Sequence, residues 1–353
     1  MLAAFWSGLG KEFAQRWAAR MLTPAFAFWL GGLAAVWWDA HAAGVRAHGW
    51  AAELNATAAA LGGLPVLAQG LLVAAGLFVP AVSALAAERL TAPVLRLLEG
   101  YWTRPRRLRT WLIARRRRRR DRWSQRVAAL ALRQRMGTLD TAEYLELRRL
   151  RAAPPEDTTR LRELLAKQAT GFDAQAAADL GRGRTILRHS PRQDALGMPT
   201  RLGDILRAAE QRPRDKYGLD AVACWYALWQ VLPAETRTDL VQARTALDGA
   251  ARTWLWGMLF LVWTPWTWWA PVAGVTVAAL AYYVGVLGDA KVFGELMVAA
   301  FDMHRFALYD ALRLPAPAAP ATEPAQDGPR VTNQLWGGLD EPGLHYSSPP
   351  DTP

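Results

Sequence analysis

The fold is decided by residues 253–288, TWLWGMLFLVWTPWTWWAPVAGVTVAALAYYVGVLG, a run of 36 residues without Asp, Glu, Lys or Arg. A helix that crosses the roughly 30 Å hydrocarbon core of a bilayer needs about 20 apolar residues, so this stretch is too long for one crossing. Pro265 and Pro271 flank a tryptophan cluster in its middle, and indole rings prefer the headgroup level of a membrane. The stretch predicts a helical hairpin with arms at about 246–264 and 269–289. The alternative is a first arm that re-enters the membrane or lies on its surface.

Two further charge-free stretches lie in the first quarter of the chain. Met21–Trp38 has 18 residues, and Leu54–Ala87 has 34 with its apolar centre at Leu61–Ala86. Each fits one crossing, so the sequence predicts an all-α, polytopic membrane protein with four transmembrane helices and a helical cytoplasmic domain. None of the four carries a charge in its middle, which argues against a proton relay or an ion-coupled transporter.

The charges are concentrated in one segment. Of the 42 basic residues in the 353-residue chain, 33 lie in 88–250, and three more precede the first crossing. The positive-inside rule therefore predicts that this segment and both termini are cytoplasmic. Arginine outnumbers lysine by 38 to 4 and alanine is abundant, as in proteins from GC-rich bacterial genomes, so we expect the bacterial inner membrane.

The predicted parts follow one another along the chain. Residues 1–20 are amphipathic and predict an interfacial helix, with a cleaved signal peptide as the alternative. Glycines and prolines in 171–199 predict mostly loop. The full order is an interfacial helix (1–20), two transmembrane helices (21–87), a basic helical domain (88–250), the transmembrane hairpin (251–289), an extension of its last helix (290–314) and a disordered Pro/Ala-rich tail (315–353).

Two segments that flank the hairpin resemble a known family. They are PTRLGDILRAAEQRPRDKYGLDAVACWYALWQVLP (199–233) and FGELMVAAFDMHRFALYDALRLPAP (293–317). Both are similar to the shared segments of a family of uncharacterised, multi-spanning bacterial membrane proteins. The resemblance implies that the two segments belong together, and it implies no activity. Both also carry apolar faces, so we expect them to pack on each other, with Trp225 and Trp229 near Phe301 or Leu308.

Signatures of catalysis and of cofactor binding are missing from the sequence. It has no G-x-x-x-x-G-K-[ST], H-E-x-x-H or G-x-S-x-G motif, so we expect no enzyme activity and no cofactor. The single cysteine, Cys224, excludes a multi-cysteine metal site and is expected to be buried. His41 and His48 are predicted to be solvated loop residues rather than metal ligands.

A fan of charged and polar residues occupies one helix and the turn after it. Such a fan could clamp an anionic ligand or hold a partner helix through bidentate arginine contacts. The alternative is a solvated helix face with weak i, i+3 pairs. The candidate contact residues are Arg201, Asp204, Arg207, Glu210, Tyr217 and Asp220.

Six consecutive arginines form the most basic stretch of the chain. In a helix they cover nearly the whole circumference, so we expect their repulsion to be offset by an external polyanion. Flanking tryptophans favour the anionic lipid surface over nucleic acid, which usually needs a reading helix or stacking platform. A solvated or merely topogenic charge run is the remaining alternative. The candidate lipid contacts are Arg115, Arg116, Arg117, Arg118, Arg119 and Arg120.

These features favour a non-enzymatic role. The leading hypothesis is an inner-membrane scaffold or adaptor that presents its basic helical domain to a cytoplasmic protein partner and to anionic lipid. The alternative is an oligomeric channel or pore-forming effector gated by its cytoplasmic helices, because small residues in the second crossing permit close packing between copies.

Overall fold

The computed structural model describes residues 24–153, 158–170, 172–317, 319–320 and 322–337. Throughout these ranges the chain forms helices and turns without a strand, which confirms the all-α class. The predicted interfacial helix 1–20 and the last part of the predicted tail lie outside the described residues. The chain divides into two compact units, Met1–Leu97 with Val241–Phe293, and Leu98–Leu240 with Gly294–Pro353.

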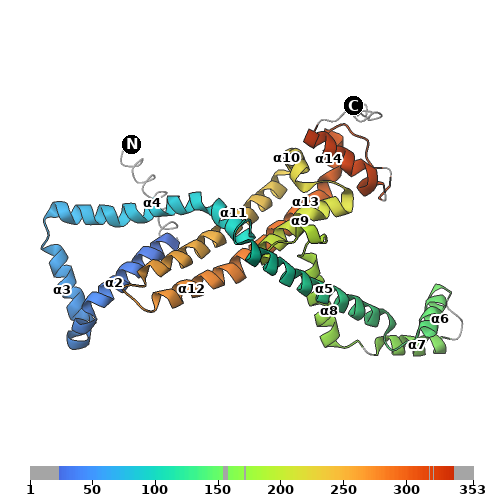
Figure 1. The fold of residues 1–353 in the computed structure, drawn as a ribbon, viewed down its shortest axis with the longest axis horizontal. Helices are drawn as coiled ribbons and strands as arrows, with labels where there is room; N and C mark the ends of the chain where they lie inside the picture. The colour runs from blue at the N-terminus through green and yellow to red at the C-terminus, as the bar shows by residue number, and fades with distance from the viewer. Residues whose placement is uncertain (1–23, 154–157, 171, 318, 321, 338–353) are drawn as a thin grey trace, which may run out of the picture. The chain divides into compact units, whose positions relative to one another are not determined.

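The first unit is built from long apolar helices, shown in blue and orange in Figure 1. Three of them, α4, α11 and α13, continue beyond the limits of the unit. The elements that contribute to it are α2 (Pro24–His48), α3 (Trp50–Gly62), α4 (Val66–Glu99), α11 (Ala234–Leu259), η2 (Phe260–Trp263), α12 (Ala270–Leu280), the π-helical turn η3 (Ala281–Val286) and α13 (Leu287–Ala311).

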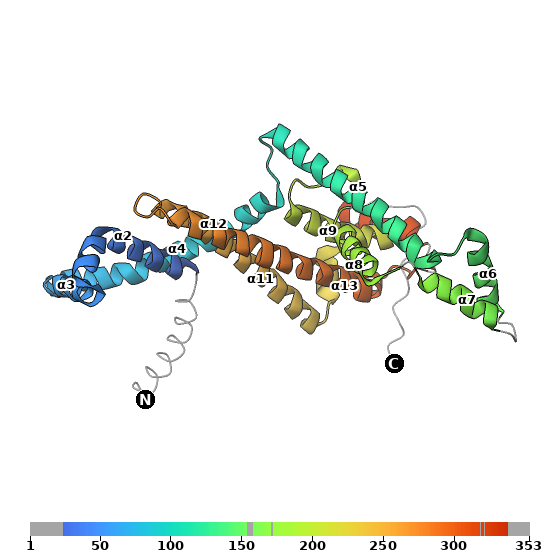
Figure 2. The ribbon, with the colours of Figure 1, turned by 90° about the horizontal axis from the view of Figure 1, so that it is seen from below.

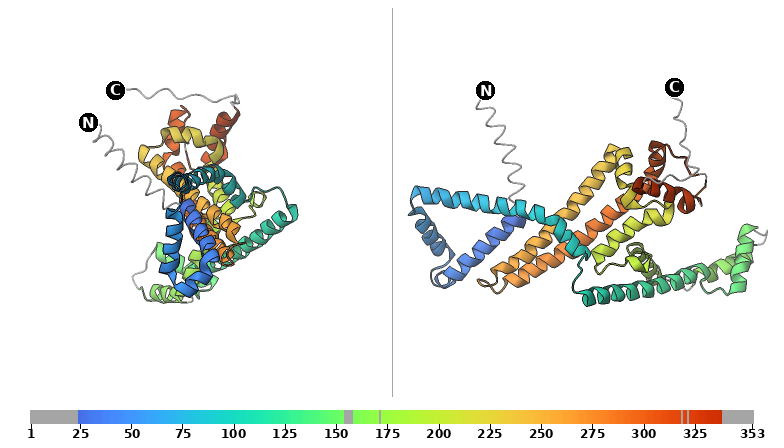
Figure 3. Two further views of the ribbon diagram at one scale, coloured as in Figure 1. Left: turned by 90° about the vertical axis from the view of Figure 1, so that its left-hand side faces the viewer. Right: turned by 45° about the horizontal axis from the view of Figure 1, so that its top comes forward.

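Helices α11 and α12 form the predicted hairpin and run side by side from the tryptophan-rich turn (Figures 1 and 3). Their backbones touch at two glycines. A Cβ atom on Gly257 would lie 2.7 Å from the backbone nitrogen of Ala278, and one on Gly274 would lie 2.6 Å from the carbonyl oxygen of Gly257. Small residues at such a crossing let two helices approach closely. The returning arm is longer than one crossing requires, because the helix continues from Ala270 to Ala311.

An aromatic cluster connects α2 to this hairpin. The ring of Phe28 lies 5.1 Å from Trp256 and 5.6 Å from Trp263, measured between centroids. Trp29 contacts Trp263 edge-on and donates a hydrogen bond from Nε1 to Ser83 Oγ of α4 at 3.0 Å. Aromatic pairs of this kind add about 0.5–1.5 kcal/mol each beyond their buried area.

Two of the described helices are long and apolar enough to cross a membrane, Val66–Glu99 and Ala270–Ala311. Helix α4 leaves most of its apolar side chains exposed, including Leu67 and Phe78. Four crossings were predicted, so the crossings by α2 and α11 stay predictions. Both of these helices mix charge with their apolar residues, since α2 contains Asp39 and the first half of α11 is charged.

The second unit combines short and long helices from two stretches of sequence (Figures 1 and 2). Residues 171–199 were expected to be mostly loop, but they include a helix of 15 residues. Besides the start of α11 and most of α13, the elements of the second unit are α5 (Arg106–Met136), α6 (Thr141–Ala152), α7 (Thr159–Ala169), α8 (Ala174–Arg188), η1 (Asp194–Leu196), α9 (Arg201–Tyr217), α10 (Ala221–Val231), η4 (Glu323–Asp327) and α14 (Gly328–Gly337).

Gly183 explains why glycines in α8 do not signal a loop. A Cβ atom there would lie 2.4 Å from Cγ2 of Val127 and 3.0 Å from the ring of Trp123. The glycine therefore allows α8 to pack closely on part of α5 (Figure 1).

The two family-like segments pack on each other as predicted. The ring of Trp225 in α10 lies 6.3 Å from that of Phe301 in α13, between centroids. A Cβ atom on Gly294 would lie 2.9 Å from Cβ of Ala209 in α9. The second unit therefore includes the helix that follows the hairpin, whereas the predicted basic domain comprised 88–250 alone.

Part of the predicted disordered tail is helical and belongs to this unit. Glu323 is buried and accepts a hydrogen bond from Arg305 Nε at 3.0 Å, and Val331 of α14 is also buried. A Cβ atom on Gly328 would clash with the carbonyl oxygen of Tyr217, so the tail approaches the end of α9 directly. The Pro/Ala-rich composition concealed this short amphipathic helix.

The close approach in the hairpin makes a first prediction. Gly257→Ala should lower the free energy of unfolding by about 1–3 kcal/mol, because the added methyl overpacks a contact between backbones. Gly288→Ala in α13 is the matched control, since nothing lies within 4 Å of its added Cβ. The control should be neutral or stabilise the helix by up to about 1 kcal/mol. Thermal unfolding in lipid nanodiscs, followed by tryptophan fluorescence, measures both. Equal midpoints would contradict the packing argument.

Candidate functional site

Helix α5 carries the arginine run and has two unlike faces. Residues three or four positions apart share one face of a helix. On one face, Arg116, Arg120, Trp123 and Val127 are partly buried, and the last two contact α8. The opposite face carries exposed arginines. The six arginines are therefore divided between two environments.

The inward face is fixed by an ion pair between Arg116 and Asp204 of α9. Nε and Nη2 of Arg116 lie 2.6 and 2.5 Å from Oδ2 of Asp204. The other carboxylate oxygen accepts a hydrogen bond from the backbone N–H of Met198 at 2.9 Å. Only 6% of Asp204 is exposed. This burial raises the pKa of the Asp204 carboxyl, and Arg116 and the Met198 N–H act against that rise.

Two more arginines of the run also bind within the unit. Arg120 donates from Nη1 to the carbonyl oxygen of Pro191 at 2.7 Å and from Nη2 to Asp194 at 2.6 Å. Arg117 pairs with the same aspartate. The expectation that the whole run needs an external polyanion is therefore corrected, because three of its six charges have acidic partners in the fold.

The arginines on the outward face of α5 are not neutralised by described residues. Arg118, Arg119 and Arg122 are exposed and form no ion pair within the described part of the chain. Arg115 lies beside them, with its guanidinium 5.4 Å from the ring centroid of Trp111. The three unpaired residues, Arg118, Arg119 and Arg122, are called the arginine face below.

The predicted fan on α9 does not form one cluster. Asp204 faces Arg116, as described, whereas Arg207 pairs with Glu210 at 3.1 Å. Burial raises the pKa of the Glu210 carboxyl. Arg201 is exposed. These residues therefore point to different surroundings.

The last two members of the fan have structural contacts. Asp220 caps the start of α10 by accepting hydrogen bonds from the N–H groups of Val222 and Ala223, at 2.9 and 3.2 Å. Tyr217 donates its hydroxyl to Asp302 of α13 at 2.8 Å, and burial raises its pKa to about 12. Tyr217 thus joins α9 to α13.

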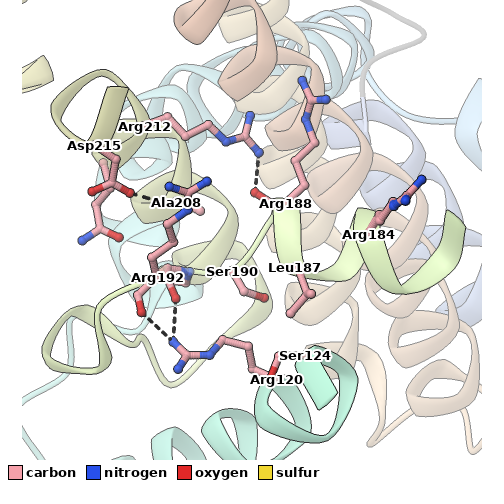
Figure 4. A pocket seen from close by; sticks show the side chains of 12 residues that line it. Arg120, Ser124, Arg184, Leu187, Arg188, Ser190, Arg192, Ala208, Arg212 and Asp215 are labelled. Carbon is pink, nitrogen blue, oxygen red and sulfur yellow. Dashed lines mark hydrogen bonds and ion pairs between the residues drawn. The ribbon is translucent and has the colours of Figure 1, made fainter. Parts of the chain in front are cut away.

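A pocket of about 530 Å³ opens between α5, α8, α9 and the segment 190–192 (Figure 4). Five arginines and a single carboxylate line it, so its wall is strongly basic. The charged lining residues are Arg120, Arg184, Arg188, Arg192, Arg212 and Asp215. The sequence did not single out this pocket, because its residues come from segments up to 95 positions apart, from Arg120 to Asp215, a spacing that no local motif can show.

The described residues offer little for metal or nucleophile chemistry. Among them, no group of three or more His, Cys, Asp or Glu side chains could hold a metal ion. Cys224 is fully buried, as predicted, and burial raises its pKa to about 11. A thiol with this pKa carries little thiolate at neutral pH and is a poor nucleophile.

Comparison with protein-family models, with curated proteins and with solved structures finds no match to this chain. The family resemblance of 199–233 and 293–317 therefore stays a prediction, and the functional argument rests on the geometry.

The Arg116–Asp204 pair makes a second prediction. Arg116→Gln should destabilise the protein by about 3 kcal/mol near pH 8, because it leaves a buried carboxylate without its cation. Burial raises the pKa of Asp204 above its unfolded value of about 3.9, so protonation of Asp204 favours the folded state. The deficit should therefore shrink as the pH falls through the raised pKa. Unfolding midpoints measured between pH 8 and about 5 test this.

Asp204→Asn is the control for this experiment. It keeps the acceptor for the Met198 N–H and removes the buried charge, while Arg116 can reach solvent. Its unfolding should depend less on pH than that of the arginine variant. A deficit in Arg116→Gln that is the same at every pH would show that packing, not charge, holds α5 to α9.

Proposed function

We propose that the chain is a multi-pass scaffold of the bacterial inner membrane that holds its basic helical unit at the anionic lipid surface and presents it to a cytoplasmic protein partner. The observation that carries this proposal is the arginine face of α5. Three exposed guanidinium groups, without carboxylate partners among the residues that the structure describes, share one side of a helix whose other side is packed.

The membrane part of the proposal is supported by exposed apolar helices. Val66–Glu99 and Ala270–Ala311 have the length and composition of spans, and α4 has exposed leucine and phenylalanine side chains over most of its length. A soluble protein rarely exposes so large a contiguous apolar surface to water. In the proposed topology α2 and α11 cross as well, and both termini lie in the cytoplasm.

Lipid contact accounts for the arginine face energetically. A basic residue close to an anionic leaflet contributes about 1 kcal/mol, so three together give a contact that salt can reverse. Nucleic acid would draw on the same charge through counterion release. However, the exposed aromatic ring on this side of α5 is Trp111, which lies under Arg115, and a tryptophan beside arginines is typical of a segment at the lipid headgroups, so we favour lipid.

The partner surface proposed here lies on α10. Tyr226 is 81% exposed and Val222 is 59% exposed, and the two lie one helical turn apart. An exposed aromatic and aliphatic pair on a rigid helix is typical of a protein contact. Arg201, at the start of α9, remains a candidate contact because it is exposed.

The proposed topology makes a third prediction. Alkaline phosphatase and green fluorescent protein, fused in parallel after Ala47, Leu150, Trp268 and Gly337, should report outside, inside, outside and inside. The positive-inside rule gives the physical reason, since the basic residues cluster near Leu150 and are sparse near the other two loops. An inside signal at Trp268 would mean that the hairpin does not cross, and the four-span proposal would be wrong.

The arginine face makes a fourth prediction. In full-length protein reconstituted into nanodiscs, backbone amides of α5 should exchange hydrogen more slowly in phosphatidylglycerol than in phosphatidylcholine. High salt should remove the difference, because the attraction is screened. Replacing Arg118, Arg119 and Arg122 with Gln should reduce the protection to the level seen in neutral lipid.

The matched control for this variant removes the same charge elsewhere. Arg148, Arg149 and Arg151 of α6 are exposed and have no ion pair in the described part of the protein. Replacing these three with Gln should leave the protection of α5 in place. If both triple variants lose protection equally, net charge alone is responsible, and the arginine face is not a lipid contact.

A further inference from the structure

The basic pocket has a combination of features that the scaffold role does not require. It is enclosed by α5, α8, α9 and the segment 190–192, and its volume of about 530 Å³ is within the 300–1,000 Å³ range of small-molecule sites. The arginine face lies on another side of α5, because Arg120 and Ser124 line the pocket and Arg118, Arg119 and Arg122 do not.

The pocket and its ion-pair partners carry an excess of positive charge. The partners of the lining arginines include Glu295, which binds both Arg188 and Arg212, and Asp194, which binds Arg120. The set comprises six guanidinium groups and four carboxylates, which leaves two positive charges uncompensated. The six cations are Arg117, Arg120, Arg184, Arg188, Arg192 and Arg212, and the four anions are Asp121, Asp194, Asp215 and Glu295.

Several of these arginines are held in place before any ligand binds. Arg120 is fixed by the carbonyl oxygen of Pro191 and by Asp194, and Arg212 is fixed by Glu295 at 3.0 Å and by the carbonyl oxygen of Arg188. In Figure 4, dashed lines mark the hydrogen bonds from Arg120 to the segment 191–192 and from Arg212 to Arg188. Fixed donors cost little entropy when an anion arrives.

Arg192 is free to move toward a ligand. Its side chain is 78% exposed, and Nε lies 3.8 Å from Asp215, its ion-pair partner among the described residues. The guanidinium of Arg184 points away from Arg120, Arg192 and Arg212 in Figure 4. Its Nη2 makes a long contact, of 3.5 Å, to Oε1 of Gln134 in α5.

We propose that this pocket binds a small phosphate monoester. The phosphate, with a charge near −2 at neutral pH, neutralises the excess positive charge and accepts hydrogen bonds from Arg192 and Arg212. Leu187 and Ala208 provide the apolar part of the wall. The same phosphate chemistry occurs in soluble phosphate esters and in lysophosphatidic acid. The proposal is independent of the scaffold role.

The test uses the full-length protein in phosphatidylcholine nanodiscs and isothermal titration with glycerol 3-phosphate. Saturable binding at one site is expected, and glycerol, which lacks the phosphate, should not bind. This comparison needs no variant. Absence of saturable binding to soluble or lipid phosphate would overturn the proposal.

Two variants assign the binding to the pocket. Arg192→Gln should weaken the binding of glycerol 3-phosphate by about tenfold, as expected for a charge-assisted hydrogen bond. Arg184→Gln is the control, because it removes the same charge from the same wall, but the guanidinium of Arg184 points away from the others. Equal losses in Arg192→Gln and Arg184→Gln would show diffuse attraction instead of a site, and would overturn the proposal.

A final arm separates the two sources of the ligand. Nanodiscs that contain lysophosphatidic acid are titrated with glycerol 3-phosphate in the same way. If the lipid occupies the pocket, the soluble ester no longer binds, and Arg192→Gln restores its access. If the soluble ester binds unchanged, the ligand comes from solution. Either result supports the phosphate site and names its source.

Discussion

The ion pair between Arg116 and Asp204 is the constraint on which the arrangement of the second unit depends. Asp204 is buried, and its carboxylate is tolerated there because one oxygen receives a guanidinium and the other a backbone N–H. The pair fixes which side of α5 faces α9. Once that side is fixed, helical geometry places Arg118, Arg119 and Arg122 on the outside, and Arg120 at the edge of the pocket.

This dependence explains why an arginine run could be recognised in the sequence but not interpreted fully. Six identical residues contain no pattern that distinguishes an inward face from an outward one. The distinguishing information lies in Asp204 and Asp194, which are about 75–90 positions away along the chain. The sequence predicted the run and its exposure. Only the structure shows that half of it has acidic partners within the fold.

Other features were predictable for a physical reason. The hairpin follows from a long charge-free stretch with prolines in its middle, and the contact between Trp225 and Phe301 follows from two apolar faces that both need cover. In each case the signal is local. The helix α8 and the helical part of the tail were missed, because glycine and proline content is a weak guide where a glycine serves close packing or a short helix is held by its neighbours.

The second unit contains arginines of two kinds, and the difference between them decides what each can recognise. Arg118, Arg119 and Arg122 are exposed and flexible, so they suit a surface of diffuse negative charge, where position matters little and salt matters greatly. Arg212 is held by a carboxylate and a carbonyl oxygen, so its remaining N–H donors point in fixed directions. Fixed donors favour a ligand of one shape over another of equal charge. A single helix, α5, contributes to both kinds of surface, because its packing against α8 and α9 leaves one side open and builds the other into a wall.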